Sequence, residues 1–216
     1  MPGPLYILNL NLSLVGVIEK HVKSGKELYV QEIQIPLTKD LPGQAFTLLS
    51  GAATDQWRKA ILSLQEAIKD PDIKSIFIDT GSELWDLLRV ARLGKLTQVL
   101  PVQYAAVNAE FRQLLQILLT CKKNVVISHK VKPEYVNDQK TNRFERSGFG
   151  DIGYDVQADL RSDRDLKKDG ADQYSITFGD CRANNEVKGK VLSGNSYNFL
   201  NVVKAIYPET TEEDWS

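Results

Sequence analysis

Short apolar runs alternate along this chain with segments whose apolar residues recur at helical spacing. Three runs that are bounded by polar residues predict buried strands at residues 5–10, 75–79 and 124–128. Apolar residues three and four positions apart predict helices at residues 54–70, with Thr54 as N-cap, and at 83–93, 111–123 and 195–206. This alternation is typical of an α/β protein with a mainly parallel central sheet and flanking helices.

The remaining segments predict a hairpin, a late strand and a polar loop. Residues 15–22 and 27–35 flank Ser24-Gly25-Lys26, and the alternation of apolar and polar residues in the second segment favours a β-hairpin. Residues 173–182 predict a late strand. Residues 130–153 contain few apolar side chains, so we expect a polar loop there.

Composition narrows the class of protein. With 216 residues, 42% hydrophobic and 25% charged, we expect one domain over residues 1–208 and a frayed acidic tail at 209–216. A net charge of −1 excludes a basic surface over the whole protein, so nucleic-acid binding has to be local. Cys121 and Cys181 are too few for a disulfide framework and predict reduced core thiols. The chain shows neither a signal peptide nor eighteen consecutive apolar residues, so we expect a cytoplasmic protein that does not bind membranes.

Polar side chains end three of the predicted strands. The three strand ends are Asn9 to Asn11, Asp79-Thr80 and Ser128-His129. In parallel sheets, ligands bind outside the carboxyl ends of the strands, so these residues are the best candidates for a functional site. Thr80 and Glu83 also match a capping box at the start of the next helix, and this structural role is compatible with a functional one for Asp79.

Five segments in this order carry a resemblance to a known family: SIFIDTGSELWDLL, NVVISHK, SGFGDIGYDVQADLR, FGDCRANNEVKG and NFLNVVKAIYPE. They resemble the bacteriophage-type P-loop NTPases of the RecA-like class, which includes phage AAA-type and recombination ATPases. The resemblance covers roughly residues 5–208. It implies a RecA-like core, ATP and Mg²⁺ as cofactors, DNA as a partner, assembly into rings or filaments, and a place in the host cytoplasm.

The resemblance also implies roles for individual residues. Asp79, beside Thr80, takes the place of the Walker B aspartate, which binds a magnesium-bound water. Ser128 and His129 take the place of the sensor that responds to the γ-phosphate, although a histidine at a strand end is as often a hydrogen-bonded structural residue. Arg182 ends a strand and is either a finger that reaches a neighbouring subunit's nucleotide or a salt-bridged surface arginine.

Two features of the family are missing. No G-x-x-x-x-G-K-[ST] loop occurs in the 216 residues, and Gly25-Lys26 is followed by Glu27. Relatives often carry a water-activating glutamate after the second strand, where this chain has Asn9 or Asn11, and an amide cannot take a proton. We therefore expect an ATPase truncated at its N-terminus or a relative without catalysis, and in either case a chain that binds ATP poorly.

Residues 130–146 suggest a surface for single-stranded DNA, because cations are interleaved with two aromatic rings. The cations are Lys130, Lys132, Lys140, Arg143 and Arg146, the rings are Tyr135 and Phe144, and Glu134, Asp138 and Glu145 dilute the charge. An ordinary lid or surface loop is the alternative for this segment.

Two further functions compete with a DNA-processing ATPase. One is a non-catalytic DNA- or partner-binding module on a degenerate NTPase scaffold. The weaker one is a nuclease that uses Asp79, Glu83 and Asp86, although the last two lie on a predicted helix.

Overall fold

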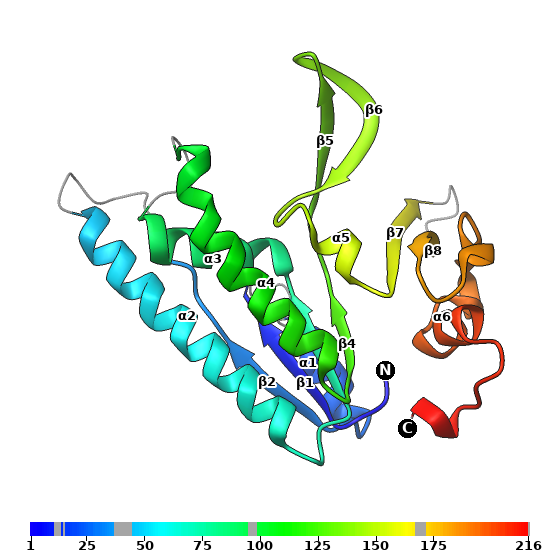
Figure 1. Ribbon diagram of the computed structural model, residues 1–216. Helices are drawn as coiled ribbons and strands as arrows, with labels where there is room; N and C mark the ends of the chain where they lie inside the picture. Colours follow the sequence, from blue (N-terminus) through cyan, green and yellow to red (C-terminus); the bar gives the residue numbers. More distant parts are fainter. Residues whose placement is uncertain (11–13, 15, 37–44, 95–98, 167–171, 216) are drawn as a thin grey trace. The chain divides into compact units, whose positions relative to one another are not determined.

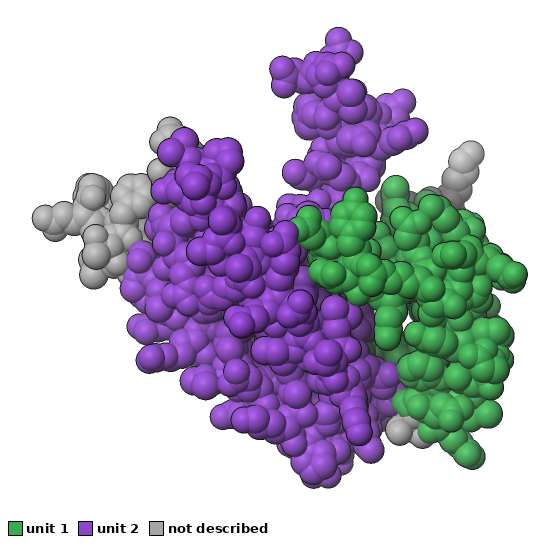
Figure 2. Space-filling model, viewed as in Figure 1, with its two compact units in different colours: residues 1, 151–216 green, residues 2–150 purple. Residues whose placement is uncertain are grey.

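The computed structural model describes residues 1–10, 14, 16–36, 45–94, 99–166 and 172–215. The chain divides into two compact units, one of residues 2–150 and one of residues 151–216 together with Met1 (Figures 1 and 2). Each unit has a sheet and helices of its own. The expectation of a single domain over residues 1–208 stays a prediction.

The larger unit is built on a four-stranded sheet in which all neighbouring strands are parallel. In spatial order its strands are β2 (Leu28–Glu32), β1 (Leu5–Asn9), β3 (Ser75–Asp79) and β4 (Asn124–Ile127). Parallel strands need crossover connections, and these contain α1 (Val17–Lys23), α2 (Ala45–Lys69), α3 (Gly81–Leu93), η1 (Pro101–Gln103) and α4 (Tyr104–Thr120). The predicted α/β class with a parallel central sheet is confirmed.

The three long helices are joined by one carboxylate. Glu110 of α4 accepts a hydrogen bond from Trp57 Nε1 of α2 at 2.8 Å and two from the Arg92 guanidinium of α3, both at 2.7 Å. The hydrogen bond from Arg92, helped by the one from Trp57, lowers the pKa of the Glu110 carboxyl. These contacts hold α2, α3 and α4 in one layer, and Tyr6 of β1 donates to Ser63 of α2, which places that layer on one face of the sheet.

The predicted hairpin at residues 15–35 is wrong. Residues 17–23 form α1, and β2 runs parallel to β1 (Figure 1). Gly16 begins the helix with a φ of 82°, and Ser24 ends it by donating to the carbonyl of His21 at 2.7 Å. Ser24-Gly25 is therefore the end of a helix rather than a hairpin turn, and Ile18 and Val22 are one helical turn apart.

Other predicted helix starts are also wrong, including that of the helix expected at residues 111–123, which begins at Tyr104. The helix expected from Thr54 begins at Ala45, because the Thr54 hydroxyl donates to the Ser50 carbonyl at 2.7 Å inside the helix instead of capping its end. The last helix, α6 (Phe199–Ile206), begins four residues later than expected, because Asn198 is its N-cap and accepts from the N–H of Asn201.

The predicted polar loop at residues 130–153 is a hairpin followed by a short helix. β5 (Val131–Val136) and β6 (Gln139–Arg146) are antiparallel, and α5 (Ile152–Asp155) comes after them. Asn137 and Asp138 turn the chain with φ of 51° and 60°, values that these residue types tolerate well in tight hairpin turns. The hairpin projects away from the parallel sheet (Figure 1).

The smaller unit contains a three-stranded antiparallel sheet and a small core. Its remaining elements are β7 (Ala158–Leu166), β8 (Asp172–Cys181), η2 (Asn185–Val187), β9 (Val191–Ser193), η3 (Gly194–Ser196), α6 and η4 (Glu213–Trp215). The core consists of Phe178, Cys181, Val187, Val202 and Ile206. Within the tail, Trp215 stacks on Tyr207 with 5.4 Å between ring centroids, and the expectation of a frayed tail stays a prediction.

Replacing Glu110 by Gln should destabilise the larger unit by about 1 kcal/mol at pH 7, since two charge-assisted bonds are lost at a partly exposed site. The pKa of Glu110 is lowered in the folded state. Its contribution is therefore present above the unfolded pKa of about 4.3 and is lost as the pH falls through the folded value. The melting temperature, measured from pH 2 to 7, should thus differ between Glu110→Gln and the parent near neutrality and converge in acid. An equal difference at every pH would contradict the assignment.

Candidate functional site at the carboxyl edge of the sheet

The register of the parallel strands places four polar residues in one row. Glu32 lies opposite Asn9, and Asn9 lies opposite Asp79. Ser128 follows Ile127, the partner of Ile78, and so stands beside Asp79. Directly opposed residues of a sheet point to the same face. The row therefore brings two carboxylates, an amide and a hydroxyl to the carboxyl edge of the sheet.

Asp79 is held by its neighbour across the sheet. The Ser128 hydroxyl donates to Asp79 Oδ1 at 2.5 Å, and Ser128 N–H donates to the Ile78 carbonyl at 3.0 Å. The Asp79 side chain is only 8% exposed. The predicted neighbours Asp79 and Ser128 are thus brought together, with the carboxylate in a fixed orientation.

Asn9, which lies opposite Asp79 in the sheet, is completely buried. Neither its amide nitrogen nor its amide oxygen has a hydrogen-bond partner among the residues that the structure describes. Leaving a buried polar group unsatisfied costs about 1–3 kcal/mol, so such groups are usually paired with protein, water or a ligand. The other candidate for this position, Asn11, lies outside the described residues.

Thr80 has the predicted capping role. Its hydroxyl accepts from the N–H of Glu83 at 3.2 Å and also donates to the Glu83 carboxylate. Lys130 forms an ion pair with the same carboxylate. The first turn of the helix that follows Asp79 is therefore tied to Lys130, the last residue before β5 (Val131–Val136).

His129 and Ser82 hold the base of the hairpin. Ser82, which is buried, donates to the Ser147 carbonyl at 2.7 Å and accepts from the N–H of Lys130 at 3.0 Å. His129 Nδ1 lies 3.2 Å from the Ser147 carbonyl, which only accepts, so Nδ1 carries the proton. The two ends of the hairpin are thus closed on the start of α3. This geometry is the structural role expected for a hydrogen-bonded histidine, and the sensor role stays a prediction.

The hairpin has two chemically different faces. Successive side chains of β5 point to opposite faces, and each paired residue of β6 points to the same face as its β5 partner. Between the pairs Pro133–Phe144 and Tyr135–Lys140, β6 contains two more residues than β5. Because two is an even number, paired residues keep to the same face on both sides of this irregularity. The ring face consists of Val131, Pro133, Tyr135, Lys140, Asn142, Phe144 and Arg146. The acid face consists of Lys132, Glu134, Val136, Gln139, Thr141, Arg143 and Glu145.

Charge and exposure differ between these faces. Tyr135 is 61% exposed and Phe144 51%. No residue on the ring face is acidic, whereas on the acid face Lys132 is paired with Glu145 at 3.1 Å and Thr141 donates to Glu134 at 2.8 Å. The hairpin therefore presents aromatic rings and cations on one side and keeps its strand acids on the other.

The candidate DNA residues are therefore not all brought together. Tyr135, Lys140, Phe144 and Arg146 share the ring face. Lys132 and Arg143 lie on the acid face, and Lys130 lies at the base against Glu83. Arg182 is exposed at the end of β8 in the smaller unit, and no ion pair of its guanidinium is found within the described part of the chain. Its salt-bridged alternative is thus not observed.

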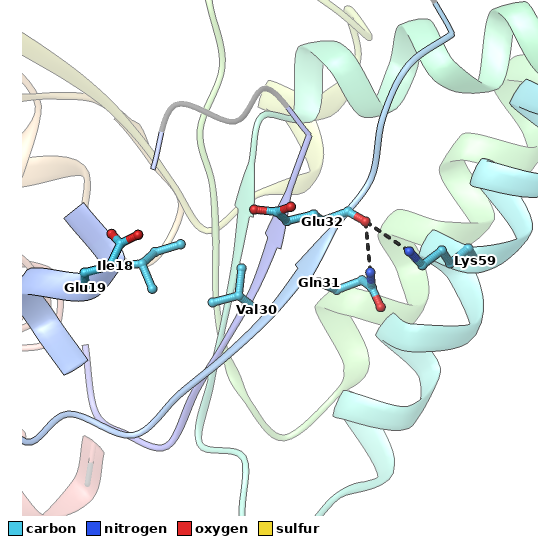
Figure 3. Close-up of a pocket in the computed structure, with 6 residues that line it drawn as sticks. All are labelled: Ile18, Glu19, Val30, Gln31, Glu32 and Lys59. Carbon is cyan, nitrogen blue, oxygen red and sulfur yellow. Dashed lines mark hydrogen bonds between the residues drawn. The ribbon is translucent and has the colours of Figure 1, made fainter. Parts of the chain in front are cut away.

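An open pocket of about 420 Å³ lies at the outer edge of the sheet. It is lined by Ile18, Glu19, Val30, Gln31, Glu32 and Lys59. Figure 3 shows Val30 and the Glu32 carboxylate on the side of β2 that faces α1, and Gln31 and Lys59 on the other side. Lys59 donates to the Glu32 backbone carbonyl at 3.3 Å rather than to its carboxylate. The Glu32 end of the polar row is therefore open to solvent.

Glu32 is the residue of this edge that sequence reasoning missed. The hairpin prediction paired residues 27–35 with residues 15–22, so it gave no reason to place Glu32 beside Asn9 and Asp79. The available signal was the alternation from Leu28 to Val30 that ends in a carboxylate, as β3 ends in Asp79. A parallel assignment would have found it.

Two of the three carboxylates proposed for a nuclease, Glu83 and Asp86, bind neighbouring side chains. Glu83 binds Thr80 and Lys130, and Asp86 pairs with Arg89 at 3.1 Å. Burial raises the pKa of the Asp86 carboxyl, an effect that Arg89 opposes. Within the described ranges, no group of three or more His, Cys, Asp or Glu side chains is placed to hold a metal ion. This arrangement does not support a nuclease centre.

Comparisons with known proteins give no family for the chain. No protein-family model matches it, and no curated protein matches it. None of the helices in the described part of the chain combines the length and apolar character that a membrane crossing requires.

Replacing Gly81 by Ala should destabilise the larger unit by about 1–3 kcal/mol through overpacking. A Cβ at this position would lie 2.6 Å from His129 Cε1 and from Ile127 Cγ2. In an uncrowded site the same change would stabilise by about 0.4–1 kcal/mol through the unfolded chain. Urea unfolding measures the difference. Gly150→Ala is the matched control, because nothing lies within 4 Å of its Cβ position. Equal stabilities of the two variants would show that His129 does not press on Gly81.

Proposed function

We propose that the chain binds single-stranded DNA through the ring face of the β5–β6 hairpin, as part of a RecA-like ATPase-family protein of phage type. One observation carries this proposal: the hairpin gathers exposed Tyr135 and Phe144 with Lys140 and Arg146 on one face, while Glu134 and Glu145 lie on the other. Rings stack on unpaired bases and cations neutralise phosphates, a combination that suits single strands without sequence preference.

Because the protein as a whole is slightly acidic, the separation of cations and acids between the two faces of the hairpin matters for DNA binding. At a net charge of −1, the chain has no overall attraction for a polyanion. A local face with two cations and no acid can still attract phosphates at close range, since charges beyond about 10 Å are screened at 0.1 M salt. A hairpin that projects from the sheet also lets a flexible strand reach the rings from the side (Figure 1).

The ATPase half of the proposal rests on Asp79 and its surroundings. Magnesium prefers oxygen ligands and keeps several of its waters, and one or two carboxylates then suffice to hold it. Asp79 with the Ser128 hydroxyl and the Asn9 amide oxygen fits such an ion. Bound there, magnesium would neutralise charge on nucleotide phosphates. Ser128 would keep the carboxylate oriented toward it, and low exposure of Asp79 would limit competing water.

A non-catalytic DNA- or partner-binding module remains the second candidate. The observation that favours it is the absence of a G-x-x-x-x-G-K-[ST] motif from the 216 residues, together with Asn9 where relatives place a carboxylate. In that case the sheet serves as a scaffold that holds the hairpin, through the contacts of Ser82, His129 and Lys130.

Removing the rings should weaken binding of a labelled oligonucleotide at every salt concentration. Each stacked base lost costs about 1–3 kcal/mol, so Tyr135→Ala and Phe144→Ala should each lower the affinity roughly 5- to 150-fold. Val136→Ala is the matched control, because Val136 is 53% exposed on the acid face. Fluorescence anisotropy measures the affinities. If Val136→Ala weakens binding as much as the ring variants, the ring face is not the binding surface.

Removing the cations should change the salt dependence instead. Each phosphate contact to a single strand contributes about −0.7 to the slope of log affinity against log salt. Lys140→Ala with Arg146→Ala should therefore flatten the slope by up to about 1.4, at an unchanged melting temperature. Lys132→Ala with Arg143→Ala removes the same charge from the acid face and should change the slope less. A larger change of slope in Lys132→Ala with Arg143→Ala than in Lys140→Ala with Arg146→Ala would contradict the proposal.

The purified chain should not hydrolyse ATP at a measurable rate. It lacks the lysine and the backbone donors of a phosphate loop within its 216 residues. Loss of one such donor alone costs about 2.7–4 kcal/mol of transition-state stabilisation. A steady-state phosphate-release assay with Mg²⁺ measures the rate. Hydrolysis that Asp79→Ala abolishes would contradict this expectation and favour a complete nucleotide site.

A further inference from the structure

We propose that Glu32, Asn9 and Asp79 form a binding site for a hard divalent cation that is occupied without any nucleotide. The site shares Asp79 with the nucleotide role proposed above, but it requires neither ATP nor DNA. It adds Glu32 as a ligand, which the proposed nucleotide role does not use, and it lets the Asn9 amide oxygen bind the ion without a nucleotide.

The strand register supplies the geometry. Glu32, Asn9 and Asp79 are directly opposed on three adjacent parallel strands, so their side chains start from one line on one face. Neighbouring strands lie about 4.8 Å apart, which puts the two carboxylate-bearing backbones about 9.6 Å from each other. A cation above Asn9 lies within reach of both carboxylates, since metal–oxygen bonds add about 2.0–2.6 Å on each side. The central amide oxygen is the third ligand.

Asn9 is the observation that indicates a ligand. Its side chain is fully buried on the middle strand of the row, and neither amide atom has a partner among the residues the structure describes. A carbonyl oxygen in this position needs a cation or a donor. Both neighbours in the row are acceptors when ionised, so they cannot donate to this oxygen. A cation shared with the two carboxylates satisfies it.

The charges around Glu32 are consistent with this assignment. Within the described ranges the Glu32 carboxylate has no ion-pair partner, and Lys59, the cation that lines the same pocket, donates to the Glu32 backbone carbonyl on the other side of β2 (Figure 3). The pocket gives an ion a path from solvent to Glu32. Three oxygen donors without nitrogen or sulfur select magnesium, manganese or calcium over zinc.

The test is a titration of the full chain with Mn²⁺ alone, with free ion measured by electron paramagnetic resonance and without nucleotide or DNA. The parent chain should bind Mn²⁺ at one site. Glu32→Gln and Asn9→Leu should each weaken binding by about 10-fold or more, because even indirect partners of metal ligands contribute that much. Asn9→Asp adds a carboxylate to the row and should strengthen binding. Glu19→Gln is the matched control, since Glu19 lines the same pocket outside the row, and it should bind as the parent does.

The outcomes separate this site from the nucleotide role. Weaker binding in Glu32→Gln and Asn9→Leu, with a cooperative melt retained, supports the site. Loss of Mn²⁺ binding in Asp79→Asn alone, with Glu32→Gln and Asn9→Leu unaffected, overturns it and leaves the Asp79 role intact. No Mn²⁺ binding by the folded parent overturns it outright. If Asn9→Leu fails to fold, the exposed Glu32→Gln variant and the gain in Asn9→Asp decide the question.

Discussion

The parallel register of β2, β1, β3 and β4 is the constraint on which the rest of the larger unit depends. Strands that run in one direction end at one edge, and here each strand ends in a polar side chain or, for β4, is followed by one. The backbone groups of the strands satisfy one another, so the strand ends are fixed and their side chains are pre-organised. The cost is local: Asn9 and Asp79 are buried at the edge of an apolar sheet, and the Asn9 amide has no hydrogen-bond partner among the described residues.

The same edge positions the hairpin. β4 leads directly into Ser128, His129 and Lys130. The Ser128 carbonyl accepts from the N–H of Gly81, and Lys130 binds Ser82 and Glu83, so both residues contact the first turn of α3. The base of the hairpin is therefore fixed beside Asp79, while its tip is built on a tight turn with a positive φ at two residues. A nucleic-acid surface and a cation site can thus be neighbours on one compact unit without sharing a side chain.

Sequence reasoning predicted the parts of the structure that depend on strong apolar patterns. The strands ending at Asn9, Asp79 and Ile127, and the cap at Thr80, followed from buried runs and capping chemistry. It failed where both faces of an element meet water. In the β5–β6 hairpin, Phe144 is the only apolar residue of β6, so that strand shows no apolar alternation. α1 buries none of its residues, so the periodicity that marks a helix against a core is weak. Glu32 was missed because strand direction is a tertiary property, which alternation alone does not encode.

The account depends most on the claim that the strand ends converge on a cation. An anomalous difference map from a crystal of the chain soaked with Mn²⁺ tests this directly. It should show one peak within about 2.0–2.6 Å of oxygens of both Asn9 and Asp79, with Glu32 bound directly or through a water. A crystal that holds Mn²⁺ elsewhere but not at this edge, with the Asn9 amide hydrogen-bonded to protein, would contradict the claim.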